Sequence, residues 1–178
     1  MHRLFVGLRP PPAIRQQLLA AMGGVPGARW QDDGQLHLTL RFIGEVERPI
    51  AEEIALALGQ VRGAPIEIAL NGVGRFEKRG RTNALWAGVS PHDTLARLHH
   101  KTDQALVRLG LEPERRAYLP HITLARMNAA PGVVERFLAD AAGLASAPFT
   151  LAHFTLFESV LGRDGASYEA VARYPLAG

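Results

Sequence analysis

Apolar and polar positions alternate along the chain in the order strand, helix, strand, helix, strand, and this order occurs twice. In the first half, short apolar runs predict strands at residues 3–8, 36–42 and 66–70. Between these strands, two segments place their apolar residues at helical spacing. One follows the prolines at 10–12 and stops at Gly23-Gly24, and the other begins at Pro49.

The second half repeats the pattern. Strands are predicted at residues 84–89, 121–127 and 149–157, with helices over 91–110 and 132–142. A last strand at 167–174 is expected to pair with 151–157 across a turn at 162–165.

The two halves also align residue by residue. Phe5-Val6-Gly7 corresponds to Trp86-Ala87-Gly88, and the His-x-Thr-x motif at residues 37–40 corresponds to the one at 121–124. We interpret this as an internal duplication covering about 3–72 and 84–157 within one bilobal domain, residues 1–178. A duplication predicts two pseudo-symmetric lobes, whose equivalent residues face each other across a groove.

Composition is that of a soluble globular protein, with 47% apolar and 21% charged residues in 178. The chain contains no cysteine, which excludes disulfides, thiolate nucleophiles and Cys-ligated zinc. No apolar run approaches the roughly 20 residues needed to span a bilayer, and residues 1–8 are too short an apolar stretch for a secretory signal. We therefore expect a cytoplasmic protein without membrane contact.

The net charge is +3, and eighteen of the twenty cations are arginines. The arginine fork suits phosphate oxygens, but a coding bias toward Arg and Ala explains most of these residues equally simply. The charge permits a nucleic-acid partner without requiring one.

The two His-x-Thr-x motifs carry the candidate chemistry. Because alternate side chains of a strand share a face, His37 and Thr39 point one way and Leu38 points into the core, and the same holds for His121 and Thr123. With seven His and seven Thr in the chain, composition alone predicts roughly 0.3 His-x-Thr pairs. Two copies at equivalent positions therefore indicate a site.

A third copy begins at His153. Under the offset of 84 that relates the other two, it corresponds to Ala69 and has no histidine partner. We interpret it as structural.

Two opposed histidines and two hydroxyls suit metal-free phosphodiester chemistry. One neutral and one protonated imidazole act as general base and general acid, and threonine hydroxyls donate to the anionic centre between them. The sequence shows no His-Glu-x-x-His motif and no carboxylate cluster, so we expect neither metal nor cofactor.

These motifs, with their surroundings, resemble the two-histidine (2H) phosphoesterases, and among them the RNA 2′,3′-cyclic phosphodiesterases, or 2′-5′ RNA ligases. The matching stretches cover essentially the whole chain and are residues 3–8, 36–46, 72–76, 85–89, 120–126 and 168–176. Glu77 departs from the family, which often has proline there, and this bears on the shape of the glycine-rich segment.

The resemblance implies an α+β fold, in which two lobes of antiparallel sheet line a V-shaped groove and the helices lie outside. It implies hydrolysis of RNA 2′,3′-cyclic phosphate ends to 2′-phosphates, with His37 as proton donor and His121 as proton acceptor, and leaves reverse 2′-5′ ligation open. RNA bearing such ends is the expected partner, and the protein is expected to be a monomer.

Other residues were assigned by strand geometry. Thr39 and Thr123 are expected to bind substrate. Arg41 shares the His37 face if the strand is regular, and contacts either RNA phosphate or solvent. For Arg126, strict alternation predicts the opposite face from His121, whereas the resemblance favours a phosphate contact. Phe42 is expected in the core.

The segment 72–81 reads as a basic loop that either grips RNA or is merely solvated, with Arg75, Lys78, Arg79 and Arg81 as its cations. Phe76 and Tyr118 either stack on a base or pack in the core. The remaining histidines of the 91–110 helix are expected on a solvated face: His92, His99 and His100.

Two alternative functions stay open from the sequence. One is a non-catalytic RNA-binding module, against which two titrating histidine motifs argue. The other is a 2H enzyme for a small cyclic nucleotide, such as ADP-ribose 1″,2″-cyclic phosphate, or for 2′-5′ oligonucleotides.

Overall fold

The computed structural model describes residues 1–177. The helices are α1 (Pro12–Ala21), α2 (Arg48–Leu58), α3 (Asp93–Arg108) and α4 (Glu135–Asp140), with a 3₁₀ turn η1 (Asp33–Gln35). The strands are β1 (His2–Leu8), β2 (Arg29–Trp30), β3 (Leu38–Val46), β4 (Ile66–Lys78), β5 (Arg81–Ser90), β6 (His121–Ala129), β7 (Phe149–Leu151), β8 (His153–Gly162) and β9 (Gly165–Pro175).

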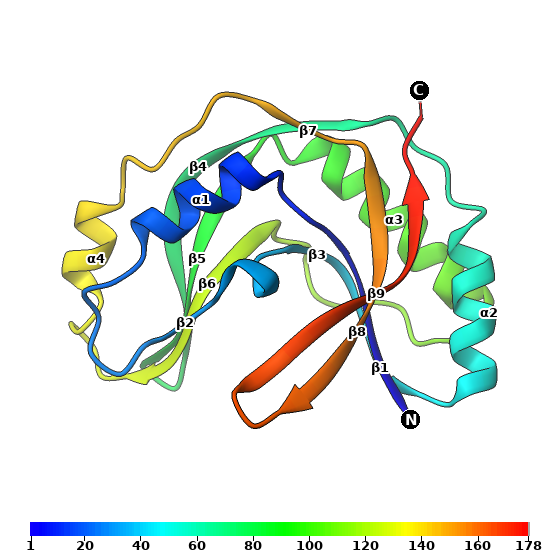
Figure 1. Ribbon diagram of the computed structural model, residues 1–178, viewed down its shortest axis with the longest axis horizontal. Helices are drawn as coiled ribbons and strands as arrows, with labels where there is room; N and C mark the ends of the chain where they lie inside the picture. Colours follow the sequence, from blue (N-terminus) through cyan, green and yellow to red (C-terminus); the bar gives the residue numbers. More distant parts are fainter. Residues whose placement is uncertain (178) are drawn as a thin grey trace.

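The strands form one antiparallel sheet in the order β7-β4-β5-β6-β3-β1-β8-β9, with β2 added beside β6. Its two halves meet at one residue pair, Leu38 of β3 with Ile122 of β6. Figure 1 shows β4, β5 and β6 fanning out on one side of this junction and β1, β8 and β9 on the other. The sheet is therefore two lobes, and the fold is α+β as expected.

The inward residues at the junction were predicted correctly. Leu38, Leu40, Ile122 and Leu124 are each at most 1% exposed. Burying a side chain of this size stabilises a fold by about 1.5–3 kcal/mol relative to exposure. The residues between them in each motif are consequently forced to the opposite face of the sheet.

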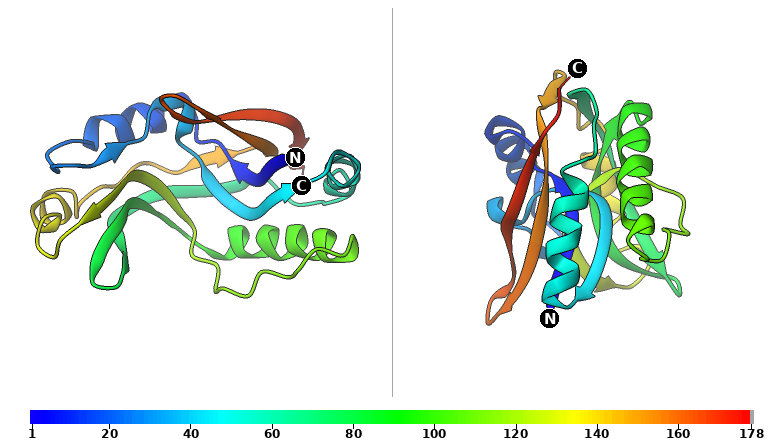
Figure 2. Two further views of the ribbon diagram at one scale, coloured as in Figure 1. Left: turned by 90° about the horizontal axis from the view of Figure 1, so that it is seen from below. Right: turned by 90° about the vertical axis from the view of Figure 1, so that its right-hand side faces the viewer.

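Segments of one half of the chain pack on the other lobe. β2, which follows α1, pairs with β6, and Gln17 of α1 donates a hydrogen bond to the carbonyl of Ala145, near β7. In return, α3 packs against β3 as well as β4, and against α2. Figure 2 shows α2 and α3 side by side along the outside of the sheet. The lobes are thus tied together by more than their short strand junction.

The segment 72–81 is a β-hairpin, so its assignment as a loop was wrong. β4 and β5 stay paired as far as Lys78 and Arg81. The turn is two residues long, with positive φ at Arg79 (55°) and Gly80 (75°), the arrangement that matches the right-handed twist of a hairpin.

Two further predicted elements differ at their boundaries. The 149–157 strand is broken at Ala152, because β7 pairs with β4 in one lobe while β8 pairs with β1 in the other. The 132–142 helix shrinks to α4, since Gly132 has a φ of 92° that an α-helix cannot contain. The closing β8–β9 hairpin is confirmed. Within residues 1–177, no helix combines the length and apolar character that a membrane crossing needs.

Candidate active site

The junction of the two lobes brings the two His-x-Thr-x motifs together. Leu38 and Ile122, the paired residues, are the middle residues of the two motifs. Because the strands are antiparallel, His37 flanks this pair on the same side as Thr123, and Thr39 on the same side as His121. The paired backbone therefore brings the two motifs side by side, close enough for the charge of His121 to act on the His37 ring.

Each histidine is oriented by the backbone two residues before it. Nδ1 of His37 lies 2.8 Å from the carbonyl oxygen of Gln35, and Nδ1 of His121 lies 2.7 Å from that of Leu119. A carbonyl only accepts, so Nδ1 carries the proton in both rings. Nε2 is thereby left as the atom that exchanges a proton with a substrate.

His37 is also tied to its own motif. Its Nε2 lies 3.0 Å from Oγ1 of Thr39. When the ring is neutral, the threonine hydroxyl donates to Nε2, and when it is protonated, Nε2–H donates to the hydroxyl. The Thr39 hydroxyl consequently lies beside Nε2 of His37, within reach of a substrate oxygen that binds to this nitrogen.

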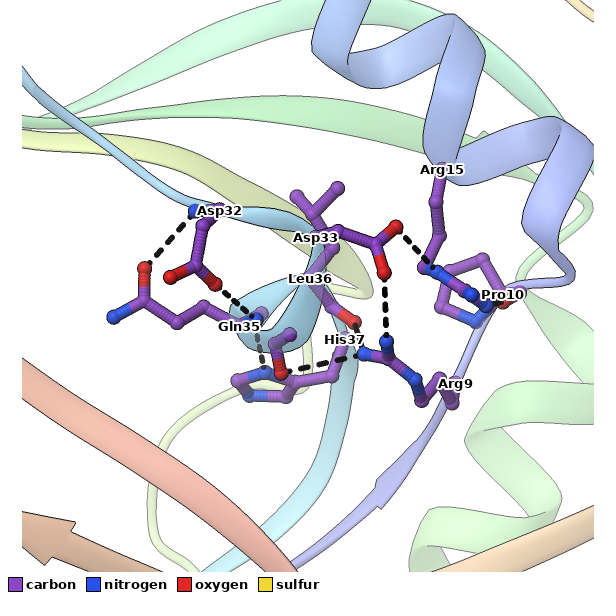
Figure 3. A network of polar contacts seen from close by, with 9 residues as sticks. Arg9, Pro10, Arg15, Asp32, Asp33, Gln35, Leu36 and His37 are labelled. Carbon is purple, nitrogen blue, oxygen red and sulfur yellow. Dashed lines mark hydrogen bonds and ion pairs between the residues drawn. The ribbon is translucent and has the colours of Figure 1, made fainter.

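A polar network fixes the turn before His37 (Figure 3). The Arg9 guanidinium donates to the carbonyls of Gly34 (3.3 Å) and Leu36 (3.1 Å). Asp33 accepts from Arg9 at 3.4 Å and from Arg15 at 2.8 Å. The hydrogen bond from Arg15 lowers the pKa of Asp33, so this carboxylate stays ionised. Charged hydrogen bonds from Arg9 and Arg15 therefore fix the turn that contains the Gln35 carbonyl.

The same turn closes on itself and on the β8–β9 hairpin. Asp32 and Gln35 form a reciprocal capping box around η1. The Gln35 side chain donates to the Ala166 carbonyl of β9 at 2.8 Å. This links the support of His37 to the hairpin whose Tyr168 packs edge-on against the His37 ring, with centroids 5.0 Å apart.

Aromatic side chains enclose both imidazoles. The ring centroid of buried Phe5 lies 4.7 Å from that of His37, and Phe76 packs edge-on against His121 at 4.8 Å. Trp86 lies 6.1 Å from His121 and packs its ring over Gly74, where a Cβ atom would come within 2.2 Å of it. Glycine at 74 is therefore required by that packing.

This environment favours the neutral imidazoles. Burial, with smaller contributions from Arg126, His121 and Arg9, lowers the pKa of His37 to about 4. Burial and the positive charge of Arg126 also lower the pKa of His121. In the free protein at pH 7, both rings are thus predominantly uncharged.

β-Bulges in the two central strands decide which residues face the groove. β3 has an extra residue at Leu40, between the pairs Thr39–Gly7 and Arg41–Val6. β6 has an extra residue at Leu124, between the pairs Thr123–Trp86 and Ala125–Leu85. The bulges lie 84 residues apart, the offset that relates the two motifs. Each reverses the inward–outward alternation after it.

The bulge in β3 overturns two expectations. Arg41 does not share the His37 face: it is 6% exposed, and its Nε donates to Asp103 of α3 at 2.7 Å. Its guanidinium also donates to the carbonyls of Phe42 and Glu112. Phe42, expected in the core, is instead 46% exposed and lines the groove. Arg41 is therefore bonded within the protein and contacts neither the groove nor solvent, contrary to the expectation.

The bulge in β6 resolves the conflict over Arg126. Strict alternation predicted the face opposite His121, but the extra residue returns Arg126 to the groove side, where it is exposed. It lines the groove together with His121 and lowers the pKa of both motif histidines. Its positive charge therefore acts on both motif imidazoles.

The groove extends from His121 along the open side of β3 and β6. It has a volume of ≈ 790 Å³. Its walls come from β3, the β4–β5 hairpin, β6 and the loop after α3: Thr39, Leu40, Phe42, Phe76, Glu77, Lys78, Asn83, Ala84, His99, Glu114, Arg116, Ala117, Tyr118, Leu119, His121 and Arg126. A groove of this volume is large enough for a ligand bigger than a phosphate group.

Of the four cations expected in segment 72–81, one lines the groove. Lys78 does so, whereas Arg75 pairs with Glu77 (2.9 Å) and with Glu135, and Arg81 donates to Asn128. Among residues 1–177, no three His, Asp or Glu side chains gather as ligands for a metal ion.

One groove residue was assigned wrongly from the sequence. His99 was expected on a solvated face, but it lines the groove and stacks on Tyr118. His92 and His100 are exposed, as expected. The pairing of His99 with Tyr118 has no local signal, because the two residues come from α3 and from the loop after it.

The third motif lies elsewhere. Thr155 is 3% exposed and pairs across Gly7, while His153 pairs with Pro175 at the far end of β8.

The lobes, the paired motifs and the groove together define a two-histidine phosphoesterase fold. A sequence profile of the 2′-5′ RNA ligase superfamily matches residues 10–163. The chain belongs to this superfamily.

Individual proteins show the same relationship. An RNA 2′,3′-cyclic phosphodiesterase of Aeropyrum pernix is 33% identical over 152 residues, which are 83% of this chain and 85% of that protein. One from Archaeoglobus fulgidus is 28% identical over 174 residues, 94% of this chain and 96% of its own. The crystal structure of E. coli LigT complexed with 3′-AMP has a TM-score of 0.82 at 26% identity and covers 99% of each chain.

Proposed function

We propose that the protein hydrolyses RNA 2′,3′-cyclic phosphate ends to 2′-phosphomonoesters without a metal ion. The observation that carries this proposal is the pair of imidazoles whose Nδ1 atoms are both held by backbone carbonyls, leaving two Nε2 atoms for one substrate. The relatives in Aeropyrum pernix and Archaeoglobus fulgidus bear the name of this activity.

In the proposed reaction, neutral His121 accepts a proton from a water molecule through Nε2. The water oxygen forms a bond to phosphorus as the bond from phosphorus to the ribose 3′ oxygen breaks. Protonated His37 donates its Nε2 proton to that departing oxygen, which leaves a 2′-phosphate and a free 3′ hydroxyl. The assignment of donor and acceptor follows the family.

The substrate itself prepares His37 for this role. Because its pKa is lowered to about 4 in the free protein, His37 is predominantly neutral at pH 7. A bound phosphodiester carries a negative charge beside Nε2 and raises that pKa. Binding and protonation are therefore coupled in the proposed mechanism.

In the proposed complex, the two motif threonines and Arg126 stabilise the anion. The hydroxyls of Thr39 and Thr123 donate to the non-bridging phosphate oxygens, and Arg126 balances the charge that develops on them. Lys78 lies farther along the groove and suits the backbone of the RNA. Since one chain supplies every group in this scheme, we propose that the protein acts as a monomer.

The test is to incubate the protein, with EDTA present, with an oligonucleotide ending in 2′,3′-cyclic phosphate and to locate the phosphate in the product. A 2′-phosphate is expected, and a 3′-phosphate or no turnover contradicts the proposal. ADP-ribose 1″,2″-cyclic phosphate and a 2′-5′ oligonucleotide, tested in parallel, distinguish the alternatives left open by the sequence.

A further inference from the structure

Two side chains from outside the sheet hold the bulge in β3. The Tyr118 hydroxyl donates to the carbonyl of Thr39 at 2.9 Å, and Nδ1 of His99 donates to the carbonyl of Leu40 at 2.6 Å. Leu40 is the extra residue of this bulge, and Thr39, which pairs with Gly7, directly precedes it. On its other side, β3 pairs with β6 only at Leu38, so no strand continues past Thr39 there.

The rings of these two residues pack against each other. His99 and Tyr118 stack with centroids 4.2 Å apart and planes inclined by 2°. Burial raises the pKa of Tyr118, so its hydroxyl remains a donor throughout the working pH range. His99 donates through Nδ1 whether its ring is neutral or protonated.

The equivalent bulge in β6 is held differently. The carbonyl of Leu124 accepts a hydrogen bond from the backbone N–H of Gln31 at 2.8 Å. The bulge in β6 is thus held by a backbone hydrogen bond, whereas the bulge in β3 is held by two side chains. The hydrogen bonds at the β3 bulge can consequently be removed by substituting His99 or Tyr118, neither of which lies in a strand.

We propose that His99 and Tyr118 are positioning residues, which hold the Thr39 hydroxyl against Nε2 of His37 and the substrate phosphate. The contacts run from the Tyr118 hydroxyl to the Thr39 carbonyl, and from Thr39 Oγ1 to His37 Nε2 at 3.0 Å. This inference rests on the proposed function for its kinetic consequences, but its structural consequence is independent of any substrate.

The first variant is Tyr118→Phe, which keeps the stacked ring and removes one hydrogen bond. We expect kcat/KM on a cyclic-phosphate oligonucleotide to fall roughly 3- to 10-fold, the worth of a single hydrogen bond, with the loss in kcat because Thr39 acts at the reacting phosphate. Tyr174→Phe is the matched control. Its hydroxyl donates to the Ala55 carbonyl at 2.8 Å, away from the groove, and its loss leaves the kinetics unchanged.

The second pair of variants tests the histidine. His99→Leu removes the donor and is expected to lower kcat, whereas His99→Asn keeps an N–H close to the position of Nδ1 and restores most of it. His92→Leu is the control on the same helix, since His92 Nε2 lies 2.8 Å from the Val89 carbonyl, away from the groove. Equal activity of His99→Leu and His99→Asn overturns the role of His99.

A double-mutant cycle shows whether Tyr118 acts through the Thr39 hydroxyl. In a Thr39→Val background, the Tyr118→Phe change is expected to have no further effect on kcat. Independent, multiplying effects overturn the proposal.

A titration of the free protein separates this inference from the proposed function. The Cε1–H signal of His37 is followed against pH by NMR in wild type, Tyr118→Phe and Tyr174→Phe. The charged and titratable groups that act on His37, namely Arg9, Arg126 and His121, are unchanged in all three. A midpoint shifted only in Tyr118→Phe supports positioning even if no cyclic phosphate is turned over, and an unshifted midpoint overturns it.

Discussion

Leu38 of β3 pairs with Ile122 of β6, and this is the only pair at which the two lobes share the sheet within residues 1–177. Each residue separates the histidine from the threonine of its own motif and is at most 1% exposed. The distance between His37 and His121 is therefore set by a buried apolar pair, Leu38 with Ile122, on the opposite face of the sheet. The histidines themselves are left free to change protonation.

The two motif histidines should be indispensable and the third expendable. We expect His37→Ala and His121→Ala each to lose about 10²–10⁴ in kcat, the usual worth of a general acid or base. His153→Ala is expected to keep most of the activity, because His153 pairs with Pro175 at the start of β8 and not at the junction of the other two motifs. Steady-state kinetics on a cyclic-phosphate oligonucleotide measure all three, and a His153→Ala defect as large as that of His121→Ala contradicts the assignment.

The pH dependence of kcat/KM should be a bell with its maximum below pH 6.5. This ratio reports the free enzyme, in which the proposed acid His37 has a pKa lowered to about 4 and the base His121 also has a lowered pKa. The acid must be protonated and the base unprotonated, so activity falls on both sides of the interval between the two coupled values.

The profile of kcat alone should lie at higher pH, because the bound phosphate anion raises both pKa values. Kinetic measurements from pH 3.5 to about 9 give both curves, within the range where stability permits. A kcat/KM maximum well above pH 6.5 shows that burial does not govern the ionisation of these rings.

A substrate with a good leaving group should separate the two roles. Such a cyclic phosphate needs little protonation of the departing oxygen, so it should rescue His37→Ala much more than His121→Ala. The ratio of variant to wild-type kcat is compared for the good and the ordinary leaving group. Rescue of His121→Ala alone shows that His121 is the proton donor. Equal rescue of both variants shows that neither role has been assigned correctly.

Two arginines near the motifs should behave in opposite ways. Arg41→Ala leaves Asp103 without its buried partner and is expected to cost about 3–5 kcal/mol of unfolding free energy. Arg126→Ala is expected to leave the unfolding free energy nearly unchanged and to lower kcat/KM roughly 10- to 100-fold through the lost charge contact. Denaturant titration and kinetics on each variant distinguish them, and a purely kinetic defect in Arg41→Ala contradicts the structural role.

Chelation should not abolish activity. Because the described chain offers no group of three metal-ligating side chains, turnover is expected to be the same with and without excess EDTA. Loss of turnover that is restored by adding a divalent ion contradicts the metal-free mechanism.

Periodicity in the sequence was enough to predict most elements and the direction of their apolar faces. The helices α1, α2 and α3 and the strands that carry the motifs follow from local spacing, because helical and strand periods are local properties of the chain. The same alternation places His37, Thr39, His121 and Thr123 on the polar face. The internal duplication remains an interpretation of the alignment.

The sequence by itself did not determine which side chains face the groove after the bulges in β3 and β6. A one-residue insertion at Leu40 or Leu124 is defined only by pairing with β1 or β5, and it turns Arg41 into the core and Phe42 and Arg126 toward the groove. The groups that satisfy the bulge carbonyls, His99, Tyr118 and Gln31, come from distant parts of the chain. Tertiary structure decided these positions, because strand register and long-range hydrogen bonds override the alternation that local sequence predicts.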